Sequence, residues 1–167
     1  MKQQWIFQQL AVSHNRVNFD CGKEQLNIYL KQYARQNHDR GIAKTFVALS
    51  TADSSTIAGF YATCAASITF ESFPASEKRL PRYPIPVMRI AQLAVDRQFQ
   101  GLRLGEELLM EALQRAILVH DATGIYAIVV DAVDESACHF YERYEFQALV
   151  DSPHSLFLPM KKVLMLG

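Results

Sequence analysis

The stretch Arg89-Ile-Ala-Gln-Leu-Ala-Val-Asp-Arg-Gln-Phe-Gln-Gly-Leu-Arg-Leu-Gly105 decides how the rest of the sequence is interpreted. It starts within a strongly apolar strand, Val87–Val95, and a helix begins near Arg103. A turn between a strand and a helix points several backbone N–H groups at one spot, and the helix dipole adds partial positive charge there. Gly101 and Gly105 let a ligand approach this backbone closely. The segment therefore predicts a site for a phosphate or pyrophosphate group.

The spacing of these glycines excludes two common phosphate-binding loops. No Gly-Lys-Ser/Thr follows, so the turn is not the phosphate loop of nucleotide hydrolases, and the G-x-G-x-x-G spacing of dinucleotide-binding folds is missing. A glycine pair before a helix is also typical of a tight turn that packs a helix against a strand. The glycines alone therefore leave a structural and a ligand-binding interpretation open.

The elements on either side of this segment predict an α+β fold. Strands are expected at residues 5–12, 45–49, 56–70, 87–95, 125–130, 146–150 and 155–159, and helices between 22 and 41, from 103 to before 124, and from 134 to 144. The first helix has Leu26, Tyr29, Leu30, Tyr33 and Ala34 at the spacing of one buried stripe. The second and third strands form an antiparallel hairpin, and a β-α-β unit occupies the second half. We predict a single domain, residues 1–167, with one mixed, mostly antiparallel sheet of about six or seven strands flanked by helices.

A loop from Glu71 to Pro86 connects the third and fourth strands and is long for a compact domain. Its prolines exclude a regular strand ladder, and it carries Lys78, Arg79 and Arg82. Because loops of this length are more often functional than not, these cations are candidates for contacts with a partner.

The composition excludes several classes of protein. Seventeen Lys and Arg residues balance seventeen Asp and Glu residues, so net charge by itself favours no nucleic-acid partner. Cys21, Cys64 and Cys138 stand far apart with no C-x-x-C pair, which predicts reduced thiols without a disulfide or a zinc site. No apolar run reaches the length of a signal peptide or a membrane helix. We therefore expect a cytoplasmic protein without a metal ion or a membrane contact.

The turn before the long helix also carries a family resemblance, because Gln100-Gly-Leu-Arg-Leu-Gly105 resembles the Q/R-x-x-G-x-G/A motif of the GNAT acetyltransferases. The resemblance implies the GNAT fold, in which the fourth and fifth strands splay apart in a V, and acetyl-CoA as the co-substrate. Backbone groups of Leu93 and Val95 would pair with the pantetheine arm. Arg103 stands where the motif has its middle glycine, and its guanidinium would add charge at the phosphates. The full set of implied contacts with acetyl-CoA is Leu93, Val95, Gln100, Gly101, Leu102, Arg103, Leu104, Gly105 and Ser136.

A second likeness is Ala137-Cys-His-Phe-Tyr-Glu-Arg-Tyr-Glu-Phe146 with Asp134 ahead of it, which looks like the superfamily's N-x-x-A-x-x-F-Y-x-x-x-G-F signature. Tyr141 occupies the position of the general acid that would protonate the departing CoA sulfur, and Tyr144 is the second candidate. Asp134 replaces the usual Asn and is a good helix N-cap, whereas Glu145 replaces the glycine that favours a left-handed helix end. By spacing alone, Tyr141 also fits a buried core aromatic.

Four further stretches resemble the acetyltransferase toxins of bacterial type II toxin–antitoxin systems. They are Phe19-Asp-Cys-Gly-Lys-Glu-Gln-Leu-Asn-Ile-Tyr-Leu30, Ile57-Ala-Gly-Phe-Tyr61, the proline-rich Arg79-Leu-Pro-Arg-Tyr-Pro-Ile-Pro-Val87, and Val130-Asp-Ala-Val-Asp-Glu-Ser-Ala137. This resemblance implies acetylation of the α-amino group of an aminoacyl-tRNA, which blocks translation, together with a ribbon-helix-helix antitoxin and often a homodimer. Contacts with tRNA phosphates would come from Lys78, Arg79, Arg82 and Arg89.

Two other functions stay open at this point. A small-molecule or peptide N-acetyltransferase would keep the site for acetyl-CoA without a basic surface. A catalytically degenerate acetyl-CoA-binding protein would keep the fold without turnover, an alternative raised by Arg103 and Glu145.

Overall fold

The computed structural model describes residues 4–77 and 79–166, which form a mixed sheet with helices. Seven strands in this part of the chain follow the order β1-β2-β3-β4-β5-β7-β6. They are β1 (Trp5–Gln9), β2 (Lys44–Ser50), β3 (Asp53–Ile68), β4 (Ile85–Val95), β5 (Ala127–Asp131), β6 (Gln147–Leu149) and β7 (Ser152–Pro159). The helices are α1 (Glu24–Ile28), α2 (Ala34–Asp39), α3 (Leu104–Ala122), α4 (Glu135–Glu142) and α5 (Met160–Leu166), with a π-helical segment η1 (Tyr29–Tyr33) between α1 and α2 and 3-10 turns η2 (Phe70–Ser72) and η3 (Arg97–Phe99).

The strand directions confirm the predicted α+β architecture. β1–β2, β2–β3, β5–β7 and β6–β7 are antiparallel, whereas β4 and β5 are parallel. The β4–β5 ladder runs from the pair Val87 and Ala127 to the pair Ile90 and Val130, although β4 continues to Val95. A parallel ladder this short agrees with the predicted opening between the fourth and fifth strands.

Several details differ from the sequence-based prediction, among them the start of β4 and an additional helix. β4 begins at Ile85, so Pro86 lies inside the strand and not in the loop. The strand tolerates this proline near its start, where the proline carbonyl still accepts a hydrogen bond from Tyr126 N at 2.8 Å. Helix α5 is not indicated by the sequence pattern, because its buried residues, Met160 and Val163, form too short a stripe to show a helical period.

The buried stripe of the first helix is interrupted by η1. Leu26, Leu30 and Ala34 are buried as expected, but Tyr33 is 51% exposed. A π-helical turn holds more residues than an α-helical turn, so positions spaced for one α-helical face drift apart across it. The prediction that Tyr33 is buried is therefore wrong, and its ring lies at the surface.

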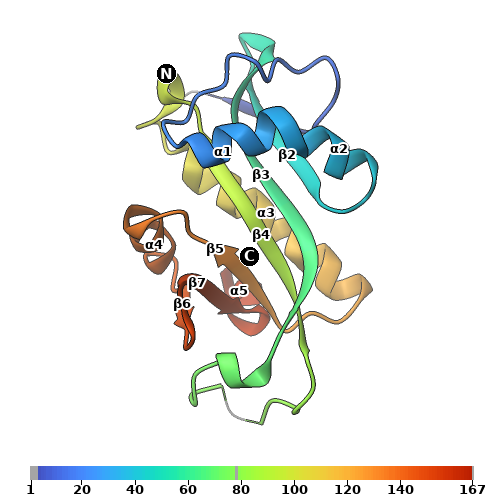
Figure 1. Cartoon of the computed structure of the whole chain (residues 1–167), viewed down its shortest axis with the longest axis vertical. Coiled ribbons are helices and arrows are strands. Elements are labelled where there is room, and N and C mark those ends of the chain that lie inside the picture. Colours follow the sequence, from blue (N-terminus) through green and yellow to red (C-terminus); the bar gives the residue numbers. More distant parts are fainter. Residues whose placement is uncertain (1–3, 78, 167) are drawn as a thin grey trace. The chain divides into compact units, whose positions relative to one another are not determined.

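One compact unit of the chain consists of the residues up to Cys64 together with Ala91–Ala112. In it, α1 and α2 cross one face of β2 and β3, and the first turns of α3 lie on the other face (Figure 1). The alternation of side chains along β3 explains both contacts. Phe60 stacks on Tyr29 with ring centroids 6.4 Å apart, whereas a Cβ at Gly59 would lie 2.9 Å from the Leu108 side chain of α3. The glycine thus lets α3 approach the strand closely.

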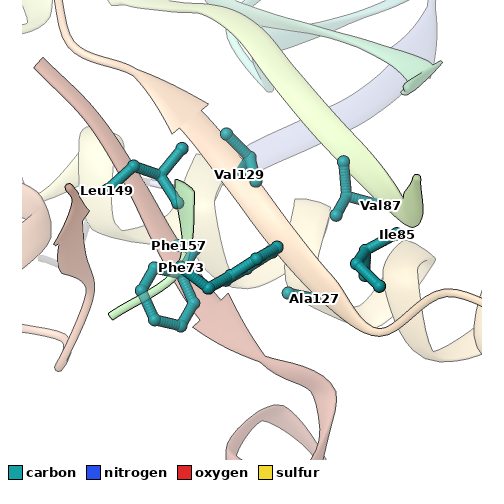
Figure 2. Close-up of a cluster of buried hydrophobic side chains, with 7 residues drawn as sticks. All are labelled: Phe73, Ile85, Val87, Ala127, Val129, Leu149 and Phe157. Atoms are coloured by element: carbon teal, nitrogen blue, oxygen red, sulfur yellow. The ribbon is translucent and has the colours of Figure 1, made fainter. Parts of the chain in front are cut away.

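The second compact unit consists of Ala65–Ile90 together with the residues from Leu113 onward. Its buried apolar cluster draws on β4, β5 and β7 (Figure 2). The Phe73 ring packs edge-on against Phe157 with centroids 5.1 Å apart, which anchors the start of the loop that leads into β4. The cluster comprises Phe73, Ile85, Val87, Ala127, Val129, Leu149 and Phe157.

Two further expectations concern membranes and thiols. Among the described residues, no helix has the length and apolar character needed to cross a bilayer. Cys21, Cys64 and Cys138 form no disulfide among the residues that the structure describes, and the reduced state of the thiols stays a prediction.

Candidate active site

The residues expected to take part in catalysis and binding fall into two groups, one in each compact unit. Leu93, Val95 and the segment 100–105 belong to the first unit, whereas Ser136 and Tyr141 belong to the second. The basic loop ahead of β4 also belongs to the second unit.

Asp96 holds the turn that follows β4. Its carboxylate accepts hydrogen bonds from Gln98 N at 2.9 Å, which caps η3, and from Asp20 N at 3.0 Å. The Asp96 N–H donates to Ala58 O at 2.8 Å and so ties the turn to β3. Because both carboxylate oxygens of this buried side chain have backbone donors, the turn is held in place by the protein itself.

Leu93 and Val95 lie on the same side of β4, because successive strand residues point to opposite faces. Both are partly exposed, whereas Ala94 between them is buried. The two residues expected to meet the pantetheine arm are thus on the more open side of the strand.

Gln100 uses its side chain to brace the same turn. Its Nε2 donates to Cys21 O and to Val95 O, each at 3.0 Å, which joins the end of β4 to the segment before α1. The sequence motif places Gln100 at the phosphates, and the structure gives its side chain this bracing role. Its backbone N–H is then the part that can meet a phosphate.

The N-terminus of α3 presents backbone N–H groups. Glu107 N donates to Arg103 O at 3.2 Å, and the N–H groups of residues 104–106 precede the first position at which an α-helix supplies an acceptor. Gly101 has a φ of 81°, and no described atom beyond its two chain neighbours lies within 4 Å of the place where its Cβ would be, so the turn is open. N–H groups at the positive end of a 19-residue helix fit a pyrophosphate.

Arg103 has the backbone conformation that glycine would supply in the motif. Its φ of 64° is in the left-handed region, which costs an L residue about 1–2 kcal/mol. Its side chain is exposed, as is the neighbouring Leu102, so neither fills the turn. Leu104 is buried, which leaves its backbone as the part available to a ligand. The chain therefore keeps the geometry of the motif although the glycine is missing.

Helix α4 begins at Asp134, as the sequence predicts. The Asp134 carboxylate accepts from Ala137 N at 2.9 Å, and Glu135 in the first turn complements the helix dipole. Ser136 is exposed in the same turn, where a ligand can reach its hydroxyl.

The end of α4 forms a Schellman motif that fixes the position of Tyr141. Phe146 N donates to Tyr141 O at 3.4 Å, and Glu145 N donates to Glu142 O at 3.1 Å. The Phe146 ring packs against the Tyr141 ring with centroids 5.6 Å apart, which is the apolar contact that accompanies this motif. Glu145 adopts a φ of 71°, so the helix ends as it would with glycine.

Tyr141 is 4% exposed. Burial raises the pKa of its hydroxyl above the usual value, and the negative charge of Asp131 raises this pKa further. A phenol with a raised pKa stays protonated at neutral pH, which is the state that a general acid requires.

Arg89 and Asp131 form an ion pair that sequence reasoning does not reveal. Arg89 Nη1 donates to both carboxylate oxygens at 2.9 and 2.8 Å, and Ser155 Oγ donates to the same carboxylate at 3.1 Å. The two partners are 42 positions apart and meet because β4 and β5 are neighbouring parallel strands. The guanidinium expected to contact tRNA thus has an internal partner in Asp131.

The loop between η2 and β4 is anchored near its start. Ser72 O accepts from Val150 N at 2.8 Å, and Ser72 Oγ donates to Asp151 Oδ2 at 2.9 Å. Further along, the Tyr126 hydroxyl donates to the Glu77 carboxylate. These bonds tie the loop to the segment between β6 and β7 and to the start of β5.

The cations of this loop are exposed. Arg79 and Arg82 both face solvent, and Arg82 also lies over the Phe70 ring, 5.4 Å from its centroid. Tyr83 beside them is 64% exposed. Lys78, the remaining cation expected to contact tRNA in this loop, lies outside the described residues.

One group of metal-ligand side chains occurs in the described part of the chain. Donor atoms of Glu135, Cys138 and His154 lie within 4.8 Å of one another. His154 Nε2 pairs with Glu135 Oε1 at 3.0 Å, and burial raises the pKa of the Cys138 thiol, which disfavours the thiolate that a metal requires. The expectation that the protein holds no metal ion stays a prediction.

Replacing Glu145 with Gly is expected to raise the free energy of unfolding by about 0.5–1 kcal/mol. The left-handed conformation costs an L residue about 1–2 kcal/mol, and glycine removes this cost. Part of the resulting stabilisation is lost again because glycine has greater conformational freedom in the unfolded chain. The melting temperature, measured by calorimetry, should rise by about 1–4 °C. The control Glu142→Gly, within α4, should lower it. A lower melting temperature for Glu145→Gly would contradict this account of the helix end.

Comparison with known proteins identifies the family of this chain. The model of the acetyltransferase (GNAT) family matches residues 18–146, a span that includes the turn after β4, α3 and the tyrosine of α4. The chain belongs to the GNAT acetyltransferase family. It is an acyltransferase that uses acetyl-CoA as its co-substrate.

Individual relatives cover nearly the whole chain. A tRNA-acetylating toxin of Mycobacterium tuberculosis is 35% identical over 144 residues, which are 86% of this chain and 85% of that protein. The crystal structure of a Tyr-to-Phe mutant of KacT superposes with a TM-score of 0.92 at 29% identity, covering 99% of this chain and 100% of that one. AtaT complexed with acetyl-methionyl-tRNAfMet superposes with a TM-score of 0.89 at 26% identity, covering 98% of this chain and 99% of that one. A Tyr-to-Phe mutant of AtaT bound to acetyl-CoA and the C-terminus of the antitoxin AtaR superposes with a TM-score of 0.84 at 25% identity, covering 97% of each chain.

Proposed function

We propose that this acetyltransferase is a toxin that acetylates the α-amino group of an aminoacyl-tRNA and thereby blocks translation. The observation that carries the proposal is the likeness over 98% of the chain to AtaT in complex with acetyl-methionyl-tRNAfMet, in which the amino acid on the tRNA carries an acetyl group. The 35% identity to a tRNA-acetylating toxin supports the same substrate class.

The first unit would hold the donor. Backbone N–H groups of residues 100–105 would bind the pyrophosphate of acetyl-CoA, with Leu93 and Val95 along the pantetheine arm. The family resemblance also assigns Ser136 to this cofactor. The bonds of Asp96 and Gln100 support this role, because they hold the turn without help from a ligand.

Tyr141 would act as the general acid. The amine nitrogen forms a bond to the acetyl carbonyl carbon, the carbon–sulfur bond breaks, and the Tyr141 hydroxyl gives its proton to the departing sulfur. The raised pKa of Tyr141 supports this role because it keeps the proton on the hydroxyl until the sulfur becomes basic. A free α-amine has a pKa of about 8, so part of the substrate is already neutral and its proton can leave to water without a dedicated base.

The basic loop would meet the acceptor end of the tRNA. Arg79 and Arg82 are exposed and can approach phosphates, and the Tyr83 ring can stack on a base. Lys78 and Arg89 would add to this contact. We also propose, from the family resemblance and from the AtaR complex of AtaT, that a ribbon-helix-helix antitoxin neutralises the protein, which would act in the cytoplasm as a homodimer.

The test is incubation of the protein with labelled acetyl-CoA and charged total tRNA. Label should appear in the tRNA fraction and be lost when the aminoacyl ester is hydrolysed. Expression without an antitoxin should arrest growth. Transfer of label to peptides or small amines but not to charged tRNA would replace the proposal with the alternative of a small-molecule or peptide N-acetyltransferase. Binding of acetyl-CoA without transfer to any amine would indicate a catalytically degenerate protein.

A further inference from the structure

Three side chains with metal-binding donor atoms meet where α4 packs beside β7, within the second unit. Glu135 and Cys138 are three positions apart on α4, a spacing that puts them on one face of the helix, and His154 comes from β7. The glutamate and the histidine are 19 positions apart, so no short sequence motif indicates the group. The expectation that the protein holds no metal ion rests on the spacing of the cysteines and therefore does not address this site.

The three donor atoms are close enough for one ion to reach all of them. An oxygen of Glu135, the sulfur of Cys138 and a ring nitrogen of His154 lie within 4.8 Å of one another, so they fit inside a circle with a radius of about 2.8 Å. Zinc binds sulfur at about 2.3 Å and nitrogen or oxygen at about 2.0–2.2 Å. Each donor atom therefore has to move by at most about 0.8 Å, which side-chain rotation can supply.

The present contacts already bring these groups to face one another. His154 Nε2 lies 3.0 Å from Glu135 Oε1, and the Cys138 sulfur lies 3.9 Å from the carbonyl oxygen of Pro153, directly before the histidine. The Glu135 and His154 side chains are exposed, so an ion can approach them from solvent, whereas Cys138 is buried. An arriving ion would exchange the contact between the two exposed groups for a bond to each and take the sulfur as its third ligand.

The charge around the thiol favours a divalent cation. The charged groups whose fields act on Cys138 are Glu135, Glu142 and Asp134, all of them acidic. Burial and these carboxylates raise the pKa of the thiol, so the sulfur keeps its proton in the metal-free protein. The same negative field attracts a dication, whose charge compensates the carboxylates and the thiolate together. Because the ion must displace a proton, we expect zinc to bind reversibly and to follow its concentration.

We propose that Glu135, Cys138 and His154 form a zinc site that fastens the start of α4 to β7. A thiolate, an imidazole and a carboxylate together suit Zn²⁺, whereas Mg²⁺ and Ca²⁺ take oxygen ligands. On binding, the thiol proton leaves to solvent and a water molecule takes the fourth position of the ion. The helix held in this way carries Tyr141 one turn further on, and zinc should therefore stabilise the part of the protein that positions this residue.

The first experiment titrates zinc into protein that has been treated with a chelator and then freed of it. At a zinc concentration about 100 times the dissociation constant, the melting temperature should rise by about 5–10 °C. Mg²⁺ and Ca²⁺ at the same concentration should leave it unchanged. Cobalt(II) is the spectroscopic probe for the same site. Its titration should produce a sulfur-to-cobalt charge-transfer band in the near ultraviolet and the strong visible bands of four-coordinate cobalt.

Two ligand variants and two matched controls test the assignment. Cys138→Ser should abolish the charge-transfer band, and His154→Gln, an exposed change that leaves the core intact, should weaken zinc binding by about 100-fold or more. Loss of a group that only orients a ligand already costs about 10–100-fold. The controls are Cys64→Ser, at a partly exposed thiol of β3, and His139→Gln, at an exposed histidine of α4. Both controls should keep the band and the affinity.

The outcomes decide the assignment without any measurement of acetyl transfer, so they are independent of the proposed function. A charge-transfer band that persists in Cys138→Ser, or that disappears in Cys64→Ser, would place the ion on a different thiol and overturn the proposal. Unchanged zinc affinity in His154→Gln would also overturn it. So would a melting temperature of the unmodified protein that does not respond to zinc.

Discussion

Replacing Tyr141 with Phe is expected to lower kcat for acetyl transfer by about 10²–10⁴-fold, the usual contribution of a positioned general acid. The change removes one hydroxyl and leaves the ring that packs against Phe146 and Phe140. The melting temperature and the affinity for acetyl-CoA should therefore stay close to those of the unmodified protein. Single-turnover acetylation of charged tRNA, together with calorimetry, measures the two quantities separately. In cells, the same variant should relieve the growth arrest.

Tyr144→Phe is the matched control for this prediction. Tyr144 lies three residues further along the same segment, is partly exposed, and contacts the Phe140 ring with centroids 5.4 Å apart. Its hydroxyl is the second candidate for the acid. A large loss of kcat in Tyr144→Phe with normal turnover in Tyr141→Phe would exchange the two assignments. Normal turnover in both variants would show that neither hydroxyl supplies the proton.

The pH dependence of acetylation follows from the same assignment. The attacking amine must be neutral, so the rate should rise with pH until the amine, with a pKa of about 8 or lower, is deprotonated. The acid must be protonated, and the pKa of Tyr141 lies above the ordinary tyrosine value because of burial and Asp131. The falling limb of the profile should therefore lie at higher pH than the ordinary tyrosine pKa of about 10. A falling limb near pH 7 would indicate a different acid.

The sequence predicts the parts of the site that depend on neighbours along the chain. The turn after β4, the start of α3 and the cap at Asp134 are all encoded within a few residues, and the structure confirms them. The missing glycines are informative in the same way, because Arg103 and Glu145 both adopt the left-handed conformation that the motifs require. The geometry of both motifs is therefore kept, at a cost in backbone strain at Arg103 and Glu145.

Features that depend on strand pairing and on burial cannot be predicted from the sequence. The Arg89–Asp131 pair depends on which residues of two parallel strands fall side by side, a register that composition does not encode. That Gln92 Oε1 has no hydrogen-bond partner among the described residues is visible only when every potential donor around it has been placed. The π-helical segment that exposes Tyr33 also escapes the sequence, because an apolar stripe is interpreted with the period of an α-helix.

Gly59→Val is expected to destabilise the protein by about 3 kcal/mol, the upper part of the range for overpacked cores. A Cβ at this position would lie 2.9 Å from the Ala94 carbonyl oxygen, 2.9 Å from Leu108 Cδ1 and 3.2 Å from Leu104 Cδ2. The leucine side chains can rotate, but the Ala94 oxygen is backbone and can move only if β4 moves. Valine adds two further methyl groups to the same space.

The consequence of that shift should extend to the donor site. Ala94 lies between Leu93 and Val95, and Leu104 begins the helix whose N–H groups are expected to bind pyrophosphate. Gly59→Val should therefore lower the melting temperature by roughly 6–12 °C and also weaken acetyl-CoA binding, as measured by calorimetry and by titration of the folded protein. Gly124→Ala is the control, since no atom lies within 4 Å of its Cβ position, and it should change stability by less than about 0.5 kcal/mol. If Gly59→Val kept the wild-type melting temperature, the close approach of β3, β4 and α3 would not be what positions the turn.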